Sequence, residues 1–569
     1  MLLLANHVLL VPHRSDLPRR NVVDNAMSHV HHLVNCTLSQ PNRSELGSCS
    51  PYPGSFFSEG GGSGRPRRRG ATWLRLGEGE GRDASDGSCA AEDGPRGGGG
   101  DRRCDEWSTT MMRMAMATSG AFGKPRTHGW EGRKKEKKWT HARKVRAQGT
   151  GSKETEGKAT WKYWPAVPIY PYGKRKTVLQ EIVPEKIWTL DQLQGLLYVA
   201  VPVRCTVVKL KRGGLLVYCP VAPTEECLAM MDKLVEKHGP VQHIVVSTAS
   251  GIEHKVFAGP FARAFPESQT WVAPNQWSFP INLPLRWLGL PANTKMLSVD
   301  KSEVPFANEV DYEICGPVPL GSPGSLASKA TFVEVAMFHK ATKTLLVTDT
   351  VVSVPRQPPK INQLYPEAML FHARDNATQP IEDTPDNRDI GWRKIALFSL
   401  YFQPNSLEAV LGKEALLDAA NAPEINRTGK YWKGLFPFQW KPEWKDSFDL
   451  LAEKKLFVAP ILQSLVLNRG PDEVLDWVDR VCKWPFERVI PAHFEARVKA
   501  SPRDFRAAFS FLQASGRRRS GWNPLDGLLD LFQPTENGQL PASDMRFVRQ
   551  LDEFVVKNKI ATAAPDPDA

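Results

Sequence analysis

The pattern of hydrophobic and polar positions divides the chain after Trp161 into strands and helices. Short β-branched runs bounded by turn residues predict strands, and segments with an apolar residue every three to four positions predict helices. The predicted elements are a hairpin at 203–221, a helix at 224–239, a strand at 243–247, a helix after Ser250, a strand at 270–274, a hairpin at 331–355, a helix at 471–484, a strand at 487–494 and helices at 501–515 and 542–558. This alternation predicts an α/β fold with layers on both faces of a sheet.

Composition separates the first 160 residues from the rest of the chain. Residues 38–105 are rich in Gly, Arg and Asp, and such sequence buries too little apolar area to offset its ordering entropy. We therefore interpret residues 1–110 as a disordered low-complexity extension, with the hypothesis that it is a gene-model artefact. Residues 111–160 are basic, with Met, Ala, Ser and Thr near their start.

The basic segment 111–160 is typical of a transit peptide that begins at Met111 or Met112. The expected location is the chloroplast, with the mitochondrion or the cytoplasm as alternatives. A disordered basic arm that binds nucleic acid without sequence preference is the other interpretation of this segment.

Charge and cysteine usage exclude several classes of function for the remaining residues. Residues 1–160 hold 26 Lys and Arg against 17 Asp and Glu, whereas the rest of the chain holds 48 against 45. The near-neutral part does not predict a specific nucleic-acid partner. The nine cysteines form no C-x-x-C pair, which argues against a zinc ribbon or a disulfide scaffold and favours a reducing compartment. No run reaches the roughly 18 apolar residues of a membrane span.

Potential metal ligands follow three of the predicted strands. Glu253 and His254 follow the strand at 243–247, Asp349 ends the run TLLVTD, and His493 ends the run VIPAH. Folds of this class place their sites at strand ends, and imidazole nitrogen with carboxylate oxygen suits Zn²⁺ or Fe²⁺.

The order of these motifs resembles the metallo-β-lactamase superfamily. Its motif Thr-His-x-His-x-Asp-His falls on residues 248–254, where Thr248 and His254 match and Glu253 replaces the Asp. Both first-metal histidines of that motif are lost, to Ala249 and Gly251, and the family's middle His has no counterpart. The run from Glu253 to Leu285 also resembles an uncharacterised domain-of-unknown-function family of photosynthetic organisms.

The resemblance implies an αββα sandwich with a mixed helical insertion. Its first part would span 161–355, an insertion packed on the core 356–470, and its second part with the C-terminal helix 471–560.

The resemblance also implies that the second metal site of the superfamily is retained. Its positions correspond to Glu253, His254, Asp349 and His493, with Glu253 or Asp349 as the catalytic proton acceptor. The implied activity is that of a mononuclear hydrolase with one Zn or Fe ion and an unknown small-molecule substrate. The alternative is a metal-free pseudoenzyme that binds a ligand or a protein partner in the plastid. A nuclease, the third class, needs a basic groove that the composition does not indicate.

Each candidate ligand also has a purely structural interpretation. Ser250 and Glu253 form the S-x-x-E pattern of a helix capping box. His254 fits a partly buried polar residue of the first helical turn, and Asp349 fits a turn residue after a strand. His493 is the strongest single candidate.

The transit-peptide interpretation makes a prediction about the mature protein. Processing after the basic segment should leave an N-terminus downstream of residue 111, which N-terminal sequencing of the protein from its native source measures. A mature start upstream of residue 111 would contradict the interpretation.

Overall fold

The computed structural model describes residues 157–162, 169–196, 198–249, 252–276, 284–325, 328–410, 412–513 and 540–565, with the backbone only for residues 252, 253 and 513. The predicted extension at 1–110 and all but the last residues of the basic segment at 111–160 lie outside the described residues.

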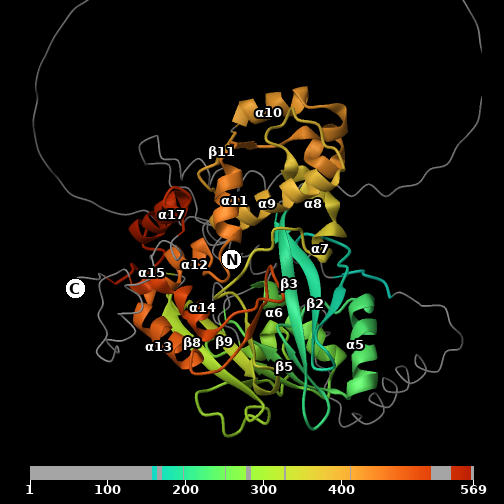
Figure 1. Cartoon of the computed structure of the whole chain (residues 1–569), viewed down its shortest axis with the longest axis vertical. Coiled ribbons are helices and arrows are strands. Elements are labelled where there is room, and N and C mark those ends of the chain that lie inside the picture. The colour runs from blue at the N-terminus through green and yellow to red at the C-terminus, as the bar shows by residue number, and fades with distance from the viewer. Residues whose placement is uncertain are drawn as a thin grey trace, which may run out of the picture. The chain divides into compact units, whose positions relative to one another are not determined.

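The larger sheet has seven strands that follow one another in chain order (Figure 1). The first four are antiparallel to their neighbours, and the strands from β4 to β7 run parallel. The predicted hairpin at 203–221 is confirmed as the β3–β4 pair. The strands are β1 (Val178–Val183), β2 (Ile187–Leu196), β3 (Val199–Lys209), β4 (Leu215–Tyr218), β5 (Val241–Val246), β6 (Gln269–Val272) and β7 (Lys295–Met296).

Two helices cover the outer face of this sheet. Helix α5 (Glu225–His238) begins as predicted, because the Thr224 side chain accepts a hydrogen bond from the Cys227 amide at 3.2 Å. Helix α6 (Ile252–Ala264) joins β5 to β6. Apolar side chains of both helices share one core cluster with the strands.

The smaller sheet has the order β13–β10–β9–β8, with only β10 and β13 parallel. Its strands are β8 (Val310–Pro319), β9 (Thr331–His339), β10 (Thr344–Val347) and β13 (Arg488–Pro491), and the helices near it are α13 (Pro471–Val481), α14 (Pro502–Ala507) and α15 (Ser510–Gln513). The single helix predicted at 501–515 is wrong. The Phe509 amide bonds to the Arg506 carbonyl three residues back, which tightens the chain and turns Phe505 and Phe509 onto Trp477.

The two sheets pack face to face around an apolar core. Leu216 and Tyr218 of β4 and Leu346 of β10 point into this layer. Their neighbours Leu215 and Val347 point outward, into the cores beneath the helices. Helix, sheet, sheet and helix layers therefore alternate, and the predicted metallo-β-lactamase-like αββα sandwich is confirmed.

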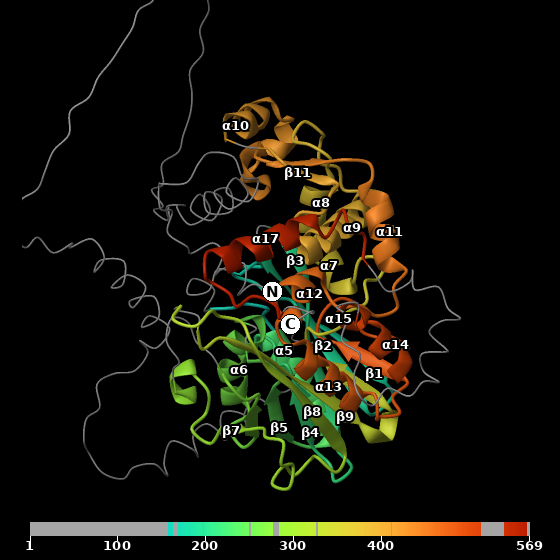
Figure 2. The same ribbon diagram turned by 90° about the vertical axis from the view of Figure 1, so that its left-hand side faces the viewer.

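Residues between β10 and α13 form a helical region beside the start of β3 (Figures 1 and 2). Its apolar side chains share the largest core cluster with Leu345 and Val347 of β10. Its segment 406–423 begins with a short strand and continues as a helix. The elements are α7 (Lys360–Gln363), α8 (Pro366–Ala373), α9 (Pro385–Tyr401), β11 (Leu407–Ala409), α10 (Gly412–Asn421), η3 (Glu424–Arg427), η4 (Gly429–Gly434), β12 (Phe438–Trp440), α11 (Trp444–Ala452), α12 (Pro460–Leu465) and η5 (Leu467–Arg469).

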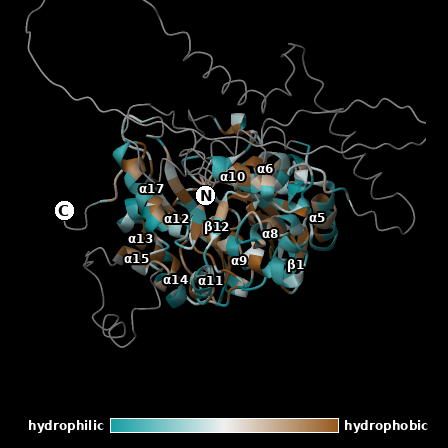
Figure 3. Ribbon diagram, turned by 90° about the horizontal axis from the view of Figure 1, so that it is seen from above, coloured by the Kyte–Doolittle hydropathy of each residue, from teal (hydrophilic) through white to brown (hydrophobic). Residues whose placement is uncertain are grey.

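The C-terminal helix α17 (Arg546–Lys557) is amphipathic, as predicted (Figure 3). Its buried side chains Val548, Leu551 and Val555 recur at helical spacing, and charged residues fill the positions between them. Within the described part of the chain, every helix is too short or too polar to span a bilayer.

Candidate metal centre

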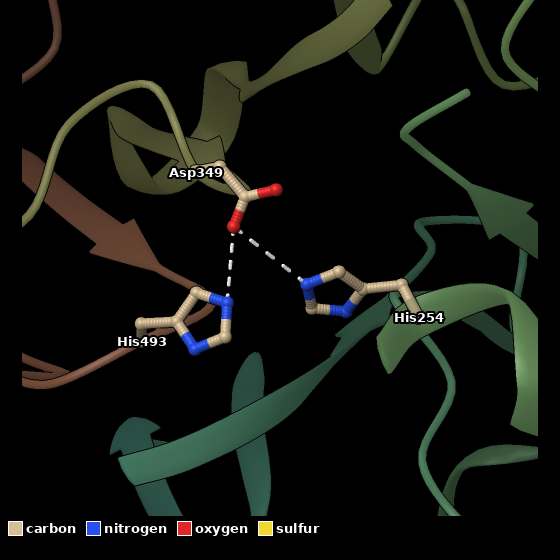
Figure 4. A group of neighbouring side chains, drawn as sticks. All are labelled: His254, Asp349 and His493. Carbon is tan, nitrogen blue, oxygen red and sulfur yellow. Dashed lines mark ion pairs between the residues drawn. The ribbon is translucent and has the colours of Figure 1, made fainter. Parts of the chain in front are cut away.

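Three side chains from separate loops meet at the edge where strands of both sheets end (Figure 4). His254 lies in the first turn of α6, Asp349 follows β10, and His493 follows β13. Nε2 of His493 is 3.0 Å from Oδ1 of Asp349, and Nε2 of His254 is 3.9 Å from the same oxygen. All three side chains are buried, and the two imidazole centroids are 5.3 Å apart. The residues that the sequence placed at three strand ends thus come together.

The strand register explains this convergence. Val347 of β10 pairs with Pro491 of the parallel strand β13, and Asp349 and His493 each lie two residues further along. They therefore leave the sheet side by side. Thr248, just after β5, forms a bridge to β9 of the other sheet, which brings the start of α6 to the same edge.

The polar ring atoms of His254 and one oxygen of Asp349 lack hydrogen-bond partners among the described residues. Both ring nitrogens of His254 and Oδ1 of Asp349 are buried and make no hydrogen bond to any described residue. The 3.0 Å approach of His493 to Asp349 is not aligned as a hydrogen bond. One ligand atom from each residue lies within 4.8 Å of the others. Two imidazoles and a carboxylate at this spacing fit a Zn²⁺ or Fe²⁺ ion.

The charge on Asp349 supports a cation at this position. Burial by itself raises the pKa of the Asp349 carboxyl, but the imidazoles of His254 and His493 hold this pKa well below its usual value. The carboxylate is therefore ionised at neutral pH. A buried anion requires a nearby positive charge, which either a metal ion or a protonated imidazole supplies.

A backbone carbonyl orients the His493 ring. Nδ1 of His493 lies 2.9 Å from the Pro202 carbonyl oxygen of β3, which can only accept, so Nδ1 carries the proton. Nε2 is then the nitrogen that faces Asp349. This carbonyl–histidine arrangement commonly fixes the tautomer of a metal-binding histidine.

The guanidinium of Arg204 holds the loop that carries His493. It bonds Asp191 through two atoms, at 2.8 and 3.0 Å, and donates to the carbonyls of Pro491 at 2.7 Å and Phe494 at 2.8 Å. The Arg204 amide also donates to the Ala492 carbonyl at 2.8 Å. Phe494 has a positive φ of 56°, a conformation that costs energy for a side-chain residue and that these bonds hold in place.

Glu334 of β9 holds the loop that carries Asp349. Its buried carboxylate accepts the amides of Thr348, Asp349 and Thr350 at 2.9, 2.7 and 3.0 Å, and the Thr350 hydroxyl at 2.7 Å. Burial and the nearby Asp349 charge raise the pKa of Glu334 to about 7. Its four donors favour the ionised form, in which all the acceptor positions are used.

The sequence interpretation missed the three charged residues Asp191, Arg204 and Glu334. Each lies inside an apolar strand run, for example Arg204 in PVRCTV and Glu334 in FVEVAM. A charge at a core position must be paired, so these interruptions were a usable signal for a buried polar network.

The first-metal positions of the resemblance do not form a site among the described residues. Ala249 is fully buried in the core between the sheets, and its amide bonds the Val333 carbonyl at 3.0 Å. Gly251 and Ser250 lie outside the described residues, as does the Glu253 side chain. The two interpretations of Glu253, ligand or helix cap, therefore remain predictions.

Comparison with known proteins identifies a family. The family described as "Domain of unknown function (DUF4336)" matches residues 184–511. No curated protein matches the chain in sequence.

Solved structures similar to this chain include two metallo-β-lactamases and a flavodiiron core. The metallo-β-lactamase DIM-1 exposed to ceftazidime is 10% identical to this chain, with a TM-score of 0.29. The alignment covers 59% of this chain and 97% of the DIM-1 chain. The metallo-β-lactamase FIM-1 from Pseudomonas aeruginosa in the mono-zinc form is 10% identical, with a TM-score of 0.26. The alignment covers 60% of this chain and 96% of the FIM-1 chain. The metal-soaked Flv1 flavodiiron core from Synechocystis sp. PCC6803 is 8% identical, with a TM-score of 0.30. The alignment covers 60% of this chain and 62% of the Flv1 chain.

Replacing Arg204 tests the support of the His493 loop. Arg204→Met leaves Asp191 charged and unpaired in the core, so the free energy of unfolding in urea should fall by about 3–5 kcal/mol. Hydrogen exchange at residues 491–495 should also accelerate.

The matched control is Arg388→Met, which breaks an Arg–Asp pair of similar two-atom geometry that lies partly exposed (2.6 and 2.8 Å to Asp383). It should cost about 1 kcal/mol or less. Equal losses in the two variants would contradict the role given to Arg204.

Proposed function

The chain belongs to the DUF4336 family, and we propose that it is a metallo-β-lactamase-like protein that binds one metal ion through His254, Asp349 and His493. The observation that carries this proposal is that Nε2 of His254 and Oδ1 of Asp349 face each other in a buried position and make no hydrogen bond to a described residue. Leaving such atoms without hydrogen bonds costs a few kcal/mol each, and one cation bound between them satisfies both.

The ligand set favours Zn²⁺ or Fe²⁺. Three protein ligands leave an open position, as in catalytic rather than structural zinc sites. When bound, such an ion acts as a Lewis acid and lowers the pKa of water.

The side chains around the site would then have separate roles in metal binding and proton transfer. His254 and His493 hold the ion, with His493 fixed in one tautomer by the Pro202 carbonyl. Asp349 is held ionised and is positioned by the Glu334 network, so it serves both as a ligand and as a proton acceptor. Glu253, one residue before His254, is the second candidate acceptor. This arrangement suits hydrolysis of an ester, thioester, amide or phosphate bond.

One contact favours the alternative function, a metal-free binding module. His493 and Asp349 approach to 3.0 Å, close enough for a protonated imidazole to neutralise the carboxylate without a metal. The protein would then bind a ligand or a protein partner and catalyse no reaction.

Metal analysis of the purified full chain separates the two functions. Elemental mass spectrometry should find about one Zn or Fe per chain, and His254→Ala and His493→Ala should each reduce this severalfold, since each removes one of only three ligands. His339→Ala is the matched control, because His339 is equally buried but bonds Thr342 at the far end of β9. A wild-type chain without metal, or metal content unchanged in both site variants, would favour the binding module.

Hydrolytic activity provides a separate test. The metal-loaded chain should hydrolyse p-nitrophenyl acetate or bis(p-nitrophenyl) phosphate, and Asp349→Asn should slow the reaction about 10²-fold or more by removing the proton acceptor. Activity that persists in Asp349→Asn or with a chelator would exclude the proposed site as its source.

A further inference from the structure

Four arginines in the described part of the chain are at most 3% exposed, and three of them have acceptors for both terminal nitrogens. Arg204 bonds as described above. Arg175 donates to the carbonyls of Leu193 at 3.1 Å and Ile169 at 2.9 Å. Arg469 donates to Ser464 at 3.2 Å and to Asp552.

Arg374, just after α8, is the exception. It is 1% exposed, and neither terminal nitrogen has a partner among the described residues. Its one side-chain hydrogen bond within the described part of the chain runs from Nε to the Phe371 carbonyl at 3.3 Å. Burial lowers the pKa of Arg374 to about 10, so the guanidinium is still charged at neutral pH. A buried cation with two unused donor groups is expensive unless an anion or water completes it.

Aromatic rings surround the Arg374 guanidinium. Its central carbon lies 4.2 Å from the Phe436 ring centroid and 5.0 Å from that of Phe371. The Trp432 ring packs 4.5 Å from Phe371, and the Tyr198 ring lies 5.3 Å from Phe371. The Phe436 and Phe371 rings stabilise the cation by cation–π attraction, but they carry no oxygen that could accept its N–H groups.

Neighbouring carboxylates of the chain are already engaged. Asp375 bonds the buried amine of Lys394, which also binds the carbonyls of Ala373 and Arg374. Glu367 pairs with Lys430 at 2.9 Å and lies two helical turns, about 10.5 Å, before Arg374 along α8. Among the described residues, therefore, no carboxylate pairs with Arg374, whereas the terminal nitrogens of the other buried arginines have acceptors.

The segment η4 lies over this group of rings. Tyr198 donates its hydroxyl to the Lys430 carbonyl at 2.7 Å, which links η4 to the turn between β2 and β3. Trp432 and Lys433 have consecutive positive φ values of 54° and 55°, which cost energy for non-glycine residues. Lys433 is exposed and Trp432 only half-buried, so η4 stands between the rings and solvent.

We propose that Arg374 anchors a second binding site, distinct from the candidate metal centre, that takes the carboxylate of a small organic acid beneath η4. The two terminal nitrogens match the two oxygens of a carboxylate. A single guanidinium balances one negative charge, and the amine of Lys394 is already used, which favours a carboxylate over a phosphate dianion. The rings of Phe371, Phe436 and Trp432 supply an apolar surface for the acid's carbon skeleton.

Benzoate is the test ligand, because it combines one carboxylate with an apolar body. Calorimetric titration of the full chain with sodium benzoate should show saturable binding. Benzoate should also raise the midpoint of thermal unfolding relative to sodium chloride of equal ionic strength. Arg374→Met should weaken it about 10- to 100-fold, the usual effect of losing hydrogen bonds to a charged group.

Arg175→Met is the matched control. Arg175 has the same exposure, stacks 5.0 Å from the Phe257 ring and also has a pKa lowered to about 10, but its terminal nitrogens are satisfied. That variant should lose stability yet bind benzoate as the wild type does.

Two further measurements test the site even if the Arg374→Met variant does not fold. Hydrogen exchange of the wild-type chain should slow at residues 429–436 on addition of benzoate, and Arg374→Lys should bind more weakly than wild type. Saturable binding of inorganic phosphate but not of benzoate or acetate would overturn the carboxylate assignment. No saturable binding of benzoate, acetate or phosphate to the wild type, or equal binding to Arg374→Met, would overturn the site and leave water as the partner of Arg374.

Discussion

The buried ion pair between Arg204 and Asp191 is the interaction on which the candidate metal centre depends most. It joins β2 and β3 of the large sheet to the loop that follows β13 of the small sheet. Without an acceptor for every N–H, a guanidinium at this depth would be strongly unfavourable. Its fixed fork geometry therefore dictates where the loop runs, and with it where His493 lies. Glu334 does the same for the Asp349 loop with an opposite charge, accepting backbone amides where Arg204 donates to carbonyls.

The pattern of retained and lost residues at this edge has a physical reason. Where the superfamily resemblance places a first-metal histidine, the chain has Ala249, whose methyl group fills the core between the sheets. Where it places second-metal ligands, the side chains remain polar and their supports are intact. Loss of one site by filling it with core, while the other keeps its buried charge network, is what a protein that needs only one ion would show. Buried charges that served no purpose would be costly to keep.

The sequence predicted most of the fold and three members of the candidate centre for one shared reason. Hydrophobic periodicity located the strands, and the three side chains come soon after strands. The parallel register of β10 and β13 brings Asp349 and His493 together, and the Thr248 bridge brings the start of α6, with His254, to the same edge. Strand β8 was missed because Gly316 and Pro317 interrupt its pattern, where the register also shifts. The prediction of a single helix at 501–515 was wrong because periodicity does not reveal the tightened turn at Phe509, which divides α14 from α15.

Residues that act through contacts distant in sequence could not be placed by local pattern. Arg204 bonds carbonyls about 290 positions away, in the loop after β13, and the residues next to Arg204 in the sequence do not indicate that loop as its partner. The same holds for Arg374, whose unusual feature is a missing partner, visible only once the other buried arginines are seen to be satisfied.

The most direct test of the central claim, that these buried polar atoms exist to hold one ion, is anomalous diffraction from crystals of the chain, recorded on both sides of the zinc and iron edges. The account predicts one anomalous peak about 2.0–2.2 Å from a nitrogen of His254, a nitrogen of His493 and an oxygen of Asp349. A well-ordered site with no anomalous peak, in which His493 and Asp349 form a direct hydrogen bond, would contradict it.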